Sequence, residues 1–497
     1  MNRQIQRLGV ALMVCFVALF AQLNYIQVFR ARNLNTHKGN GRPIIAAFNR
    51  PRGTITSADG AVLAQSKEVN DQYKYLRTYP EGDLFGPVTG YFNISFGAAG
   101  VEQQYNEELA GRTAKQQFRT LSDLFVKKDR SGNATLTIRK DVQQVARVAL
   151  GDRNGSVVVL DPKTGDVLAM WSYPSYDPNP LSVHGKDPKL AQDATNRKVL
   201  LDHVAGQPLL ARAYRQVFYP GSTFKVVTGS VGVESGKVTP DQPVYPQLDG
   251  LVLPQTKSLK LRNYGGEVCG GALFDILKVS CNSSFAQMGL DLGGPTMITG
   301  AEAFGFNNPP PIDLPGPAKS VFPTVDYNRQ LGSLAQASIG QFDVKATPLQ
   351  MALVAATIAN HGKTMTPHLL KDIRDGDGNV VKEYKAKPWR TPISDQTATT
   401  MRQAMLGVVQ DGTATGLQID GHEVAGKTGT AELGSNPPTN HAWIIGFAGK
   451  PNADPEVAVA VLVEGQPGVA SEQTGGQVAA PIAKTVMQKV LQIKEGG

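Results

Sequence analysis

The N-terminal residues form one long apolar stretch. Arg7 to Phe29, RLGVALMVCFVALFAQLNYIQVF, carries almost no charge over the length that a bilayer-spanning helix needs. A cleaved signal peptide is the alternative, but no small-x-small cleavage site follows the apolar core at Leu8 to Phe20. We therefore expect residues 1–29 to form a short tip and an uncleaved membrane anchor.

Beyond the anchor, apolar and polar positions follow the pattern of a mixed α/β protein. Residues 30–49 are polar and have little periodicity, which is typical of a stalk. Asn49 to Ser66 predicts two short strands around a Gly-rich turn, and Gly100 to Gly111 predicts a short helix that ends at its last glycine. Ala134 to Leu150 passes from an alternating strand into a helix with one apolar side.

A larger α/β region begins at Gly155. Val157 to Leu160 is an apolar run typical of a buried strand, and Asp166 to Trp171 is the expected return strand. Strands, helices and Gly/Pro-rich loops then alternate up to Pro481 to Ile493, which predicts an amphipathic helix. We place the domain boundary near Arg153. The predicted organisation is an anchor (1–29), an N-terminal module (30–153) and a C-terminal domain (154–493).

The composition is that of a globular protein. The chain has 497 residues, of which 41% are hydrophobic and 19% charged, enough for two or three domains with large cores. Its net charge of +8 is compatible with nucleic acid, a membrane surface or an anionic cell envelope. No Lys/Arg-rich run, zinc pattern or aromatic-basic motif favours nucleic acid. No Cys/His cluster has metal-ligand spacing, so we expect no metal and no cofactor.

The sequence contains three cysteines. Cys15 lies in the predicted anchor, whereas Cys269 and Cys281 lie in the part expected to be soluble. If that part is exported, a disulfide between them is one possibility, and two free buried thiols are the other.

The tripeptide Lys-Thr-Gly occurs twice, and the first copy has the composition of a turn. Lys163 to Gly165 stands in LDPKTGDVLAM, where Asp161 and Pro162 start a turn and Gly165 closes it. A lysine at the tip of such a hairpin is most simply a solvated residue.

The second copy, Lys427 to Gly429, stands in HEVAGKTGTAELG, which predicts a short strand. Lys427 supplies a positive charge, and the hydroxyls of Thr428 and Thr430 can hold a carboxylate. Gly429 has no side chain, so the backbone of a ligand could approach closely. A strand of this kind can pair with an extended peptide.

A serine and a lysine one helical turn apart stand in VFYPGSTFKVVTGSVGVESG. Ser222 and Lys225 are three positions apart, so they share one face of a helix. A serine hydroxyl needs a base before it is a good nucleophile, and a lysine of lowered pKa can be that base. The helix is apolar beyond Lys225, which would draw the lysine towards the interior. Ordinary surface composition at a helix start is the alternative.

A second polar pair lies in FDILKVSCNSSFAQMG. Ser280 and Asn282 can face one way in a non-helical turn while Cys281 faces the other. A serine hydroxyl can relay a proton, and an asparagine amide can both donate to and accept from a peptide. A helix cap or polar turn is the simpler alternative.

In this order, the three elements resemble the penicillin-binding protein transpeptidases and serine β-lactamases. Longer blocks extend the resemblance over nearly the whole chain, and RGTITSADGAVLA (52–64) resembles the N-terminal module of the class B penicillin-binding proteins, with the greatest likeness to the actinobacterial penicillin-binding protein A type. The longer blocks are YPGSTFK (219–225), IGQFDVKATPLQMA (339–352), HAWIIGFAG (441–449) and TGGQVAAPI (474–482). The resemblance implies an α/β (α+β) fold with a central antiparallel sheet flanked by helices.

The resemblance also implies D,D-transpeptidation of peptidoglycan stem peptides. Ser222 would attack the penultimate D-Ala carbonyl after Lys225 takes its proton, and Ser280 would pass a proton to the leaving amine. Lys427 would hold Ser280 and lower the pKa of Lys225, while Asn282 would position the substrate amide. The remaining implied substrate contacts are Thr428, Gly429 and Thr430, with the backbone N–H groups of Ser222 and Thr430 as the oxyanion hole.

The implied partners are stem peptides, β-lactams, a membrane glycosyltransferase and division proteins. Because the substrate lies outside the cytoplasmic membrane, we expect a single-pass protein with Arg3 and Arg7 inside and the catalytic domain outside. The resemblance suggests a role in septal wall synthesis.

Related activities are the alternatives. A D,D-carboxypeptidase differs only in using water as the acceptor, and a β-lactam sensor or scaffold would keep the fold without catalysis. Class A β-lactamases carry a Glu-x-x-x-Asn loop between the second and third elements, and no such spacing occurs between Asn282 and Lys427. The region before Arg153 is too short for a glycosyltransferase domain.

Overall fold

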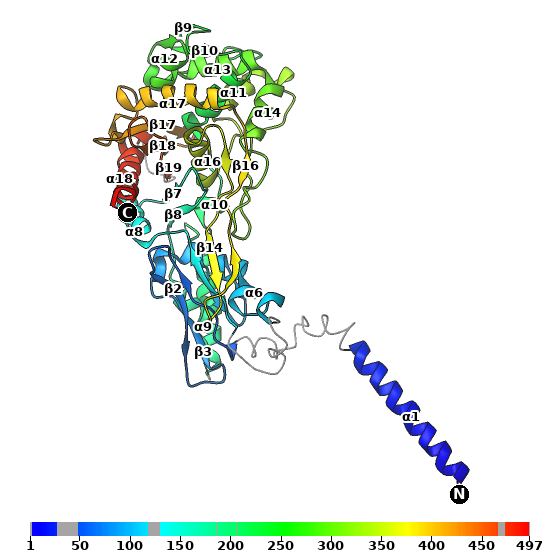
Figure 1. Ribbon diagram of the computed structural model, residues 1–497. Helices are drawn as coiled ribbons and strands as arrows, with labels where there is room; N and C mark the ends of the chain where they lie inside the picture. Colours follow the sequence, from blue (N-terminus) through cyan, green and yellow to red (C-terminus); the bar gives the residue numbers. More distant parts are fainter. Residues whose placement is uncertain are drawn as a thin grey trace.

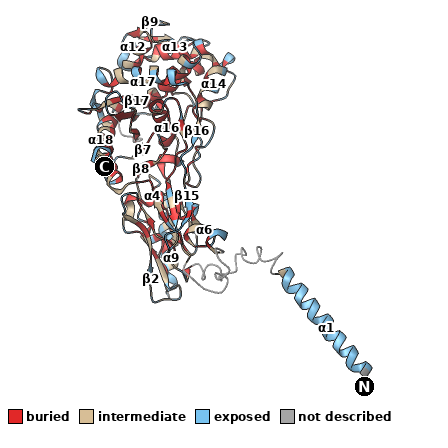
Figure 2. Cartoon of the chain, in the orientation of Figure 1, coloured by how far each residue is buried: buried red, intermediate tan, exposed pale blue. Residues whose placement is uncertain are grey.

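The computed structural model describes residues 2–26, 48–117, 130–185, 187–204, 206–465 and 473–496. Helix α1 (Asn2–Asn24) stands apart from the body of the protein, and its residues 3–24 are exposed (Figures 1 and 2). It is long and apolar enough to cross a membrane. Residues 27–29 of the predicted anchor and nearly all of the predicted stalk lie outside the described residues.

The C-terminal region is built on a five-stranded antiparallel sheet in the order β17-β18-β19-β7-β8. Apolar residues fill β7 and β19 because both faces of the sheet are covered. The strands are β7 (Gly155–Leu160), β8 (Val167–Tyr173), β17 (Glu423–Glu432), β18 (Asn440–Gly449) and β19 (Val457–Val463). Strand β17 is an edge strand, so one of its sides is not paired within the sheet.

Helices cover both faces of this sheet, as predicted (Figure 1). Helices α8 (Lys140–Leu150) and α18 (Ala480–Gly496) lie on one face, and α18 buries the predicted residues Ile482, Val486, Val490 and Leu491. Helices α16 (Pro348–Ala359) and α17 (Asp395–Gln410) pack on the other, and α11 (Lys225–Glu234) packs against α17. The predicted fold class is therefore confirmed.

A second sheet forms the core of the N-terminal module, in the order β15-β14-β6-β1-β2-β3. Strands β1 and β6 are parallel, and the other pairs are antiparallel. The strands are β1 (Ile55–Thr56), β2 (Val62–Glu68), β3 (Tyr75–Thr78), β6 (Asn133–Leu136), β14 (Leu370–Arg374) and β15 (Val380–Glu383). Two of these strands come from far beyond Arg153, so the sheet includes residues from both sides of the predicted boundary, which stays a prediction.

Local predictions in the module hold with one difference. Strands β1 and β2 form the expected antiparallel pair around a turn in which Gly60 has φ of +83°. The single helix predicted between Gly100 and Gly111 is instead two short helices, α5 (Gly100–Gln104) and α6 (Asn106–Leu109). The helical conformation is interrupted between them at Tyr105, which is buried and donates a 2.6 Å hydrogen bond to Asp313.

The remaining elements connect these two cores or surround the cleft described below. The helices are α4 (Gly86–Thr89), α7 (Ala114–Gln117), α9 (Pro188–His203), α10 (Arg212–Arg215), α12 (Leu273–Lys278), α13 (Asn282–Leu292), α14 (Gly294–Ala303) and α15 (Leu331–Ala337). The strands are β4 (Phe92–Asn93), β5 (Gly97–Ala98), β9 (Tyr245–Leu248), β10 (Gly250–Val252), β11 (Lys260–Arg262), β12 (Cys269–Gly271), β13 (Thr364–Met365) and β16 (Pro388–Arg390).

Candidate active site

All three chemistry-bearing elements of the sequence meet at one cleft. The cleft has a volume of about 850 Å³ and is lined by Ser222, Ser280, Asn282, Thr428 and Thr430, among others. These residues come from the 3₁₀ turn η5 (Gly221–Phe224), from the α12–α13 junction and from edge strand β17. The first Lys-Thr-Gly copy lies elsewhere, at the β7–β8 turn.

Ser222 lies at the cleft because η5 packs tightly against β17. Gly221 has φ of +52°, and a Cβ atom there would lie 2.8 Å from the carbonyl oxygen of Thr430. Only glycine combines this backbone conformation with so close an approach. One turn later, Lys225 begins α11 and is completely buried, while Ser222 stays partly exposed. The apolar helix thus draws the lysine inward, as its sequence indicated.

Ser280 is held in a conformation that is unusual for serine. Its φ is +61°, in the left-handed region that favours glycine. The N–H of Ser280 donates to the carbonyl of Leu277 at 3.1 Å, and the N–H of Cys281 donates to that of Ile276 at 2.8 Å. This pair of bonds is a Schellman motif, which ends α12. The next helix, α13, begins at Asn282, so the junction presents both side chains to the cleft.

The two buried lysines meet at Ser280. Lys225 Nζ donates to Asn282 Oδ1 at 2.6 Å and to the Ser280 carbonyl at 2.7 Å, and it lies 3.3 Å from Ser280 Oγ. Lys427 Nζ donates to the same Oγ at 2.8 Å and to the carbonyl of Thr428 at 3.0 Å. Ser280 therefore connects the lysine of the first element with the lysine of the third.

The electrostatics favour a neutral amine in this pair. Both lysines are completely buried, and among the described residues neither has a carboxylate within 4.0 Å. Burial, and secondly the positive charge of Lys427, lower the pKa of Lys225 well below its usual range. Burial lowers the pKa of Lys427 to about 7. A neutral Lys225 can use its two N–H bonds for the two short contacts and keep a lone pair for a proton.

Hydroxyl groups follow β17 into the cleft. Thr428 Oγ1 lies 2.7 Å from Thr413 Oγ1, and both residues line the cleft with Thr430. Gly429 faces away from this row: a Cβ atom there would lie 2.8 Å from Thr223 Cγ2 and 2.9 Å from the carbonyl oxygen of Pro220. The packing of η5 on β17 therefore accounts for the glycine, and the close approach of a ligand that we expected from the sequence stays a prediction.

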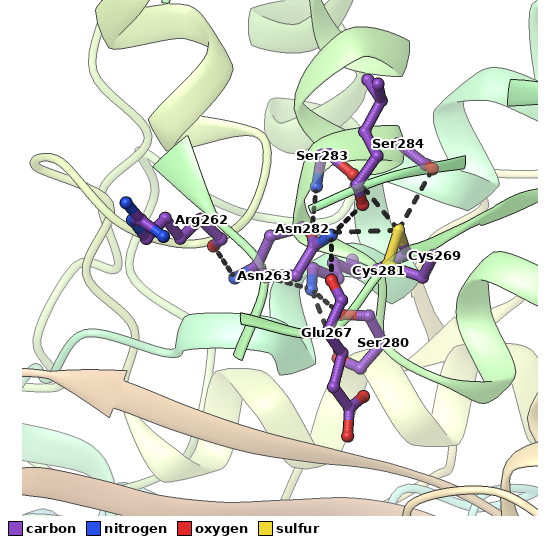
Figure 3. Close-up of a disulfide and its surroundings, with 11 residues drawn as sticks. Arg262, Asn263, Glu267, Cys269, Ser280, Cys281, Asn282, Ser283 and Ser284 are labelled. Atoms are coloured by element: carbon purple, nitrogen blue, oxygen red, sulfur yellow. Dashed lines mark hydrogen bonds between the residues drawn. A yellow bond between two sulfur atoms is a disulfide. The ribbon is translucent and has the colours of Figure 1, made fainter. Parts of the chain in front are cut away.

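A disulfide joins Cys269 to Cys281 beside the Ser280–Asn282 junction (Figure 3). Of the two alternatives that the sequence left open, the structure has the bridge. It ties the start of α13 to strand β12.

Two polar residues at this site were not found from the sequence. Thr413 stands in a loop after α17, and Asn263 follows β11. Neither lies in a motif with a recognisable spacing. Tertiary packing alone brings Thr413 to Thr428 and Asn263 to the backbone N–H of Ser283. A polar residue within a Gly-rich segment was the only signal, and it is too common to be informative.

Family comparisons agree with this geometry. The model of the penicillin-binding protein transpeptidase domain matches residues 155–488, and that of the penicillin-binding protein A dimerisation domain matches residues 52–135. The chain therefore belongs to the penicillin-binding protein transpeptidase family, which confirms the resemblance inferred from its motifs.

Individual relatives show which members of this family the chain is similar to. The chain is 38% identical to the peptidoglycan D,D-transpeptidase PbpA of Mycolicibacterium smegmatis, over 99% of each chain. It is 36% identical to PbpA of Mycobacterium tuberculosis, again over 99% of each. The structure of penicillin-binding protein A from M. tuberculosis as a ceftriaxone acyl-enzyme complex is similar, with a TM-score of 0.81 and 35% identity over 90% of this chain and 100% of that one.

Proposed function

We propose that this chain is a peptidoglycan D,D-transpeptidase that forms its acyl-enzyme on Ser222. The observation that carries the proposal is the convergence of Lys225, Ser280, Asn282 and Lys427, from three separate segments, beside the cleft that Ser222 lines. A pair of buried lysines without a carboxylate can supply a neutral amine near neutral pH, which nucleophilic catalysis by serine requires.

Acylation begins when Lys225 takes the proton of Ser222. Ser222 Oγ then bonds to the carbonyl carbon of the penultimate D-Ala of a donor stem peptide. The carbonyl oxygen becomes an oxyanion, which the backbone N–H groups of Ser222 and Thr430 stabilise. The proton passes through Ser280 to the leaving amine, so terminal D-Ala departs neutral at that nitrogen and the acyl-enzyme remains.

The other residues bind the donor. Asn282 holds the substrate amide, and Thr428 and Thr430 hold the terminal carboxylate beside the charge of Lys427. The unpaired side of β17 can accept the donor backbone as an added strand. The amine of a neighbouring stem peptide then attacks the ester, Ser222 regains its proton, and the cross-link is complete. β-Lactams acylate the same serine.

The membrane topology, the partner enzyme and the cellular role belong to the same proposal. Helix α1 anchors the protein with Arg3 and Arg7 on the cytoplasmic side and the cleft outside, where peptidoglycan is assembled. A membrane glycosyltransferase supplies the glycan strands that this protein cross-links. We assign the activity to septal wall synthesis together with division proteins.

Covalent labelling tests the nucleophile. Full-length protein in detergent is incubated with a fluorescent penicillin, and Ser222→Ala is expected to abolish the label while the protein stays folded. Thr228→Ala is the control that should keep the label: among the described residues, the buried Thr228 hydroxyl on α11 donates only to the Ser338 carbonyl, at 2.7 Å. A label that persists on Ser222→Ala would overturn the assignment.

Product analysis tests the reaction. The protein is incubated with a stem pentapeptide and an amine acceptor, and the cross-linked product is expected to exceed the hydrolysed one. Mainly hydrolysed product would identify a D,D-carboxypeptidase instead.

A further inference from the structure

The N-terminus of α13 lacks the cap that a helix start usually has. The N-cap residue is Cys281, and its side chain makes no capping hydrogen bond because its sulfur is bonded to Cys269. The first backbone N–H groups of a helix have no partner within the helix, and a cap normally supplies an oxygen to the N–H at the second or third position. Asn282, one of the candidate active-site residues, is the first residue of this helix.

Asn263 supplies that oxygen from another part of the chain (Figure 3). The N–H of Ser283, the second residue of α13, donates to Asn263 Oδ1 at 2.9 Å. Asn263 is buried, with 5% of its surface exposed, and its Nδ2 donates to the carbonyl of Leu248 at 2.6 Å and to that of Glu267 at 2.9 Å. The amide is thus fixed at both ends and cannot rotate without losing three hydrogen bonds.

The residue before Asn263 holds Asn282 directly. Asn282 Nδ2 donates to the carbonyl of Arg262 at 3.0 Å, so its other amide atom, Oδ1, is turned towards Lys225 Nζ at 2.6 Å. Two consecutive residues of the β11 end therefore hold two consecutive residues of α13. An amide that flipped would present Nδ2 to the Lys225 amine. The amine would then lose its acceptor Oδ1, and Nδ2 would compete for the lone pair that takes up the proton.

We propose that Asn263 is a positioning residue for transpeptidation: its side chain caps α13 in place of Cys281 and keeps Asn282 oriented towards Lys225. This inference rests on the proposed function, because it assigns Asn263 an effect on the acylation of Ser222. Asn263 does not contact the reacting atoms and acts through Asn282.

The test compares acylation rates in the full-length protein in detergent, with fluorescent penicillin as the probe. Asn263→Ala is expected to lower the maximal acylation rate by about 10-fold to 100-fold, since small misplacements at a reacting centre have effects of this size. The half-saturating concentration should change less than about threefold. Asp249→Asn is the matched control: it removes the negative charge from a 2.5 Å contact with Lys260 in the same hairpin. The change leaves the residues that hold α13 in place, so it should keep the rate within about twofold.

Two further measurements separate positioning from stability. Asn263→Asp keeps an oxygen for the Ser283 N–H but loses both donated bonds, so it should be about as destabilised as Asn263→Ala in thermal unfolding and yet acylate several-fold faster. In an Asn282→Ala background, Asn263→Ala should cost less than about twofold, because the residue it positions is gone.

The opposite results overturn the inference. These are wild-type rates for folded Asn263→Ala, rates that simply follow thermal stability across the variants, or a full additional loss in the Asn282→Ala background. Failure of the proposed function is distinguishable, since wild-type protein would then carry no label on Ser222.

Discussion

Two regions of this protein bury a pair of cations, and they treat the charge in opposite ways. In the N-terminal module, Arg52 and Arg77 both contact Glu102 at 2.5 Å, and all three side chains are nearly or completely buried. In the active site, Lys225 and Lys427 are also buried, but the residues they contact are uncharged. One cluster contains a carboxylate as a counter-charge, and the other contains none among the described residues.

The pKa values show what this difference does. Burial alone would raise the pKa of Glu102, but Arg77 and Arg52 outweigh it and hold the carboxylate ionised, with a lowered pKa. The lysines have no such counter-charge, so burial lowers both of their pKa values. The first arrangement fixes the fold of the module. The second creates an amine that can take up a proton, and that chemistry is obtained at the expense of stability.

The largest effect should come from removing the base. Lys225→Met takes away a buried amine that has no carboxylate partner among the described residues. General-base catalysis is typically worth about 10²–10⁴-fold, so we expect acylation to fall by about 10³-fold. The free energy of unfolding should stay equal or rise. Time courses of penicillin labelling and urea unfolding measure the two quantities. A large loss of stability would show that the lysine supports the fold, as the arginines do.

Removing the shared carboxylate should have the reverse outcome. Glu102→Gln leaves Arg52 and Arg77 buried without a counter-charge, which typically costs about 3–5 kcal/mol of stability. The folded fraction should still be acylated at the wild-type rate. Exposed Glu107→Gln, on the next short helix, is the control, with an expected change below about 0.5 kcal/mol. A small effect of Glu102→Gln in urea unfolding would contradict the comparison.

The pH dependence of stability should also differ between the clusters. The pKa of Lys427 is about 7 when folded and near 10.5 when unfolded, so the unfolded state binds more protons between these values. Its cost is complete below about pH 7 and is relieved as pH rises towards 10.5, with a slope of at most about 1.4 kcal/mol per pH unit. Glu102 instead contributes stability above its unfolded pKa, which is lost on acidification.

Comparing the wild type with a variant isolates the contribution of Lys427 to the pH dependence of stability. The difference in unfolding free energy between wild type and Lys427→Met, measured by urea unfolding from pH 7 to pH 9.5, should shrink as pH rises. A difference that is independent of pH would mean that Lys427 stays charged in the folded protein throughout this range.

The two clusters also differ in how far the sequence predicts them. Ser222 with Lys225, and Ser280 with Asn282, stand close together in the chain, so local spacing reveals each pair and their order reveals the site. Arg52, Arg77 and Glu102 stand about 25 residues apart on elements that share no periodicity. Nothing local distinguishes them from surface charges until the module is folded.

The lack of a local pattern also explains why other features of the fold and the site could not be predicted from the sequence. Strand β7 of the central sheet could be predicted because it contains a continuous apolar run, but the pairing of β14 with β6 joins segments that no local pattern connects. Asn263 accepts a hydrogen bond from the start of α13 although it stands 20 residues earlier in the chain, and Thr413 contacts Thr428 from a separate loop. Tertiary packing brings each of these partners together.

The smallest effect should come from the first Lys-Thr-Gly copy, which tests whether burial and not the tripeptide decides the role of a lysine. Lys163 is half exposed and pairs with Asp454 at 3.2 Å across the surface, so Lys163→Ala should change stability by less than about 1 kcal/mol and leave the acylation rate within about twofold. Lys427→Ala, which removes the buried copy, should lower the same rate by at least about 10²-fold. Equal effects of the two substitutions on penicillin labelling would show that burial does not distinguish the two lysines.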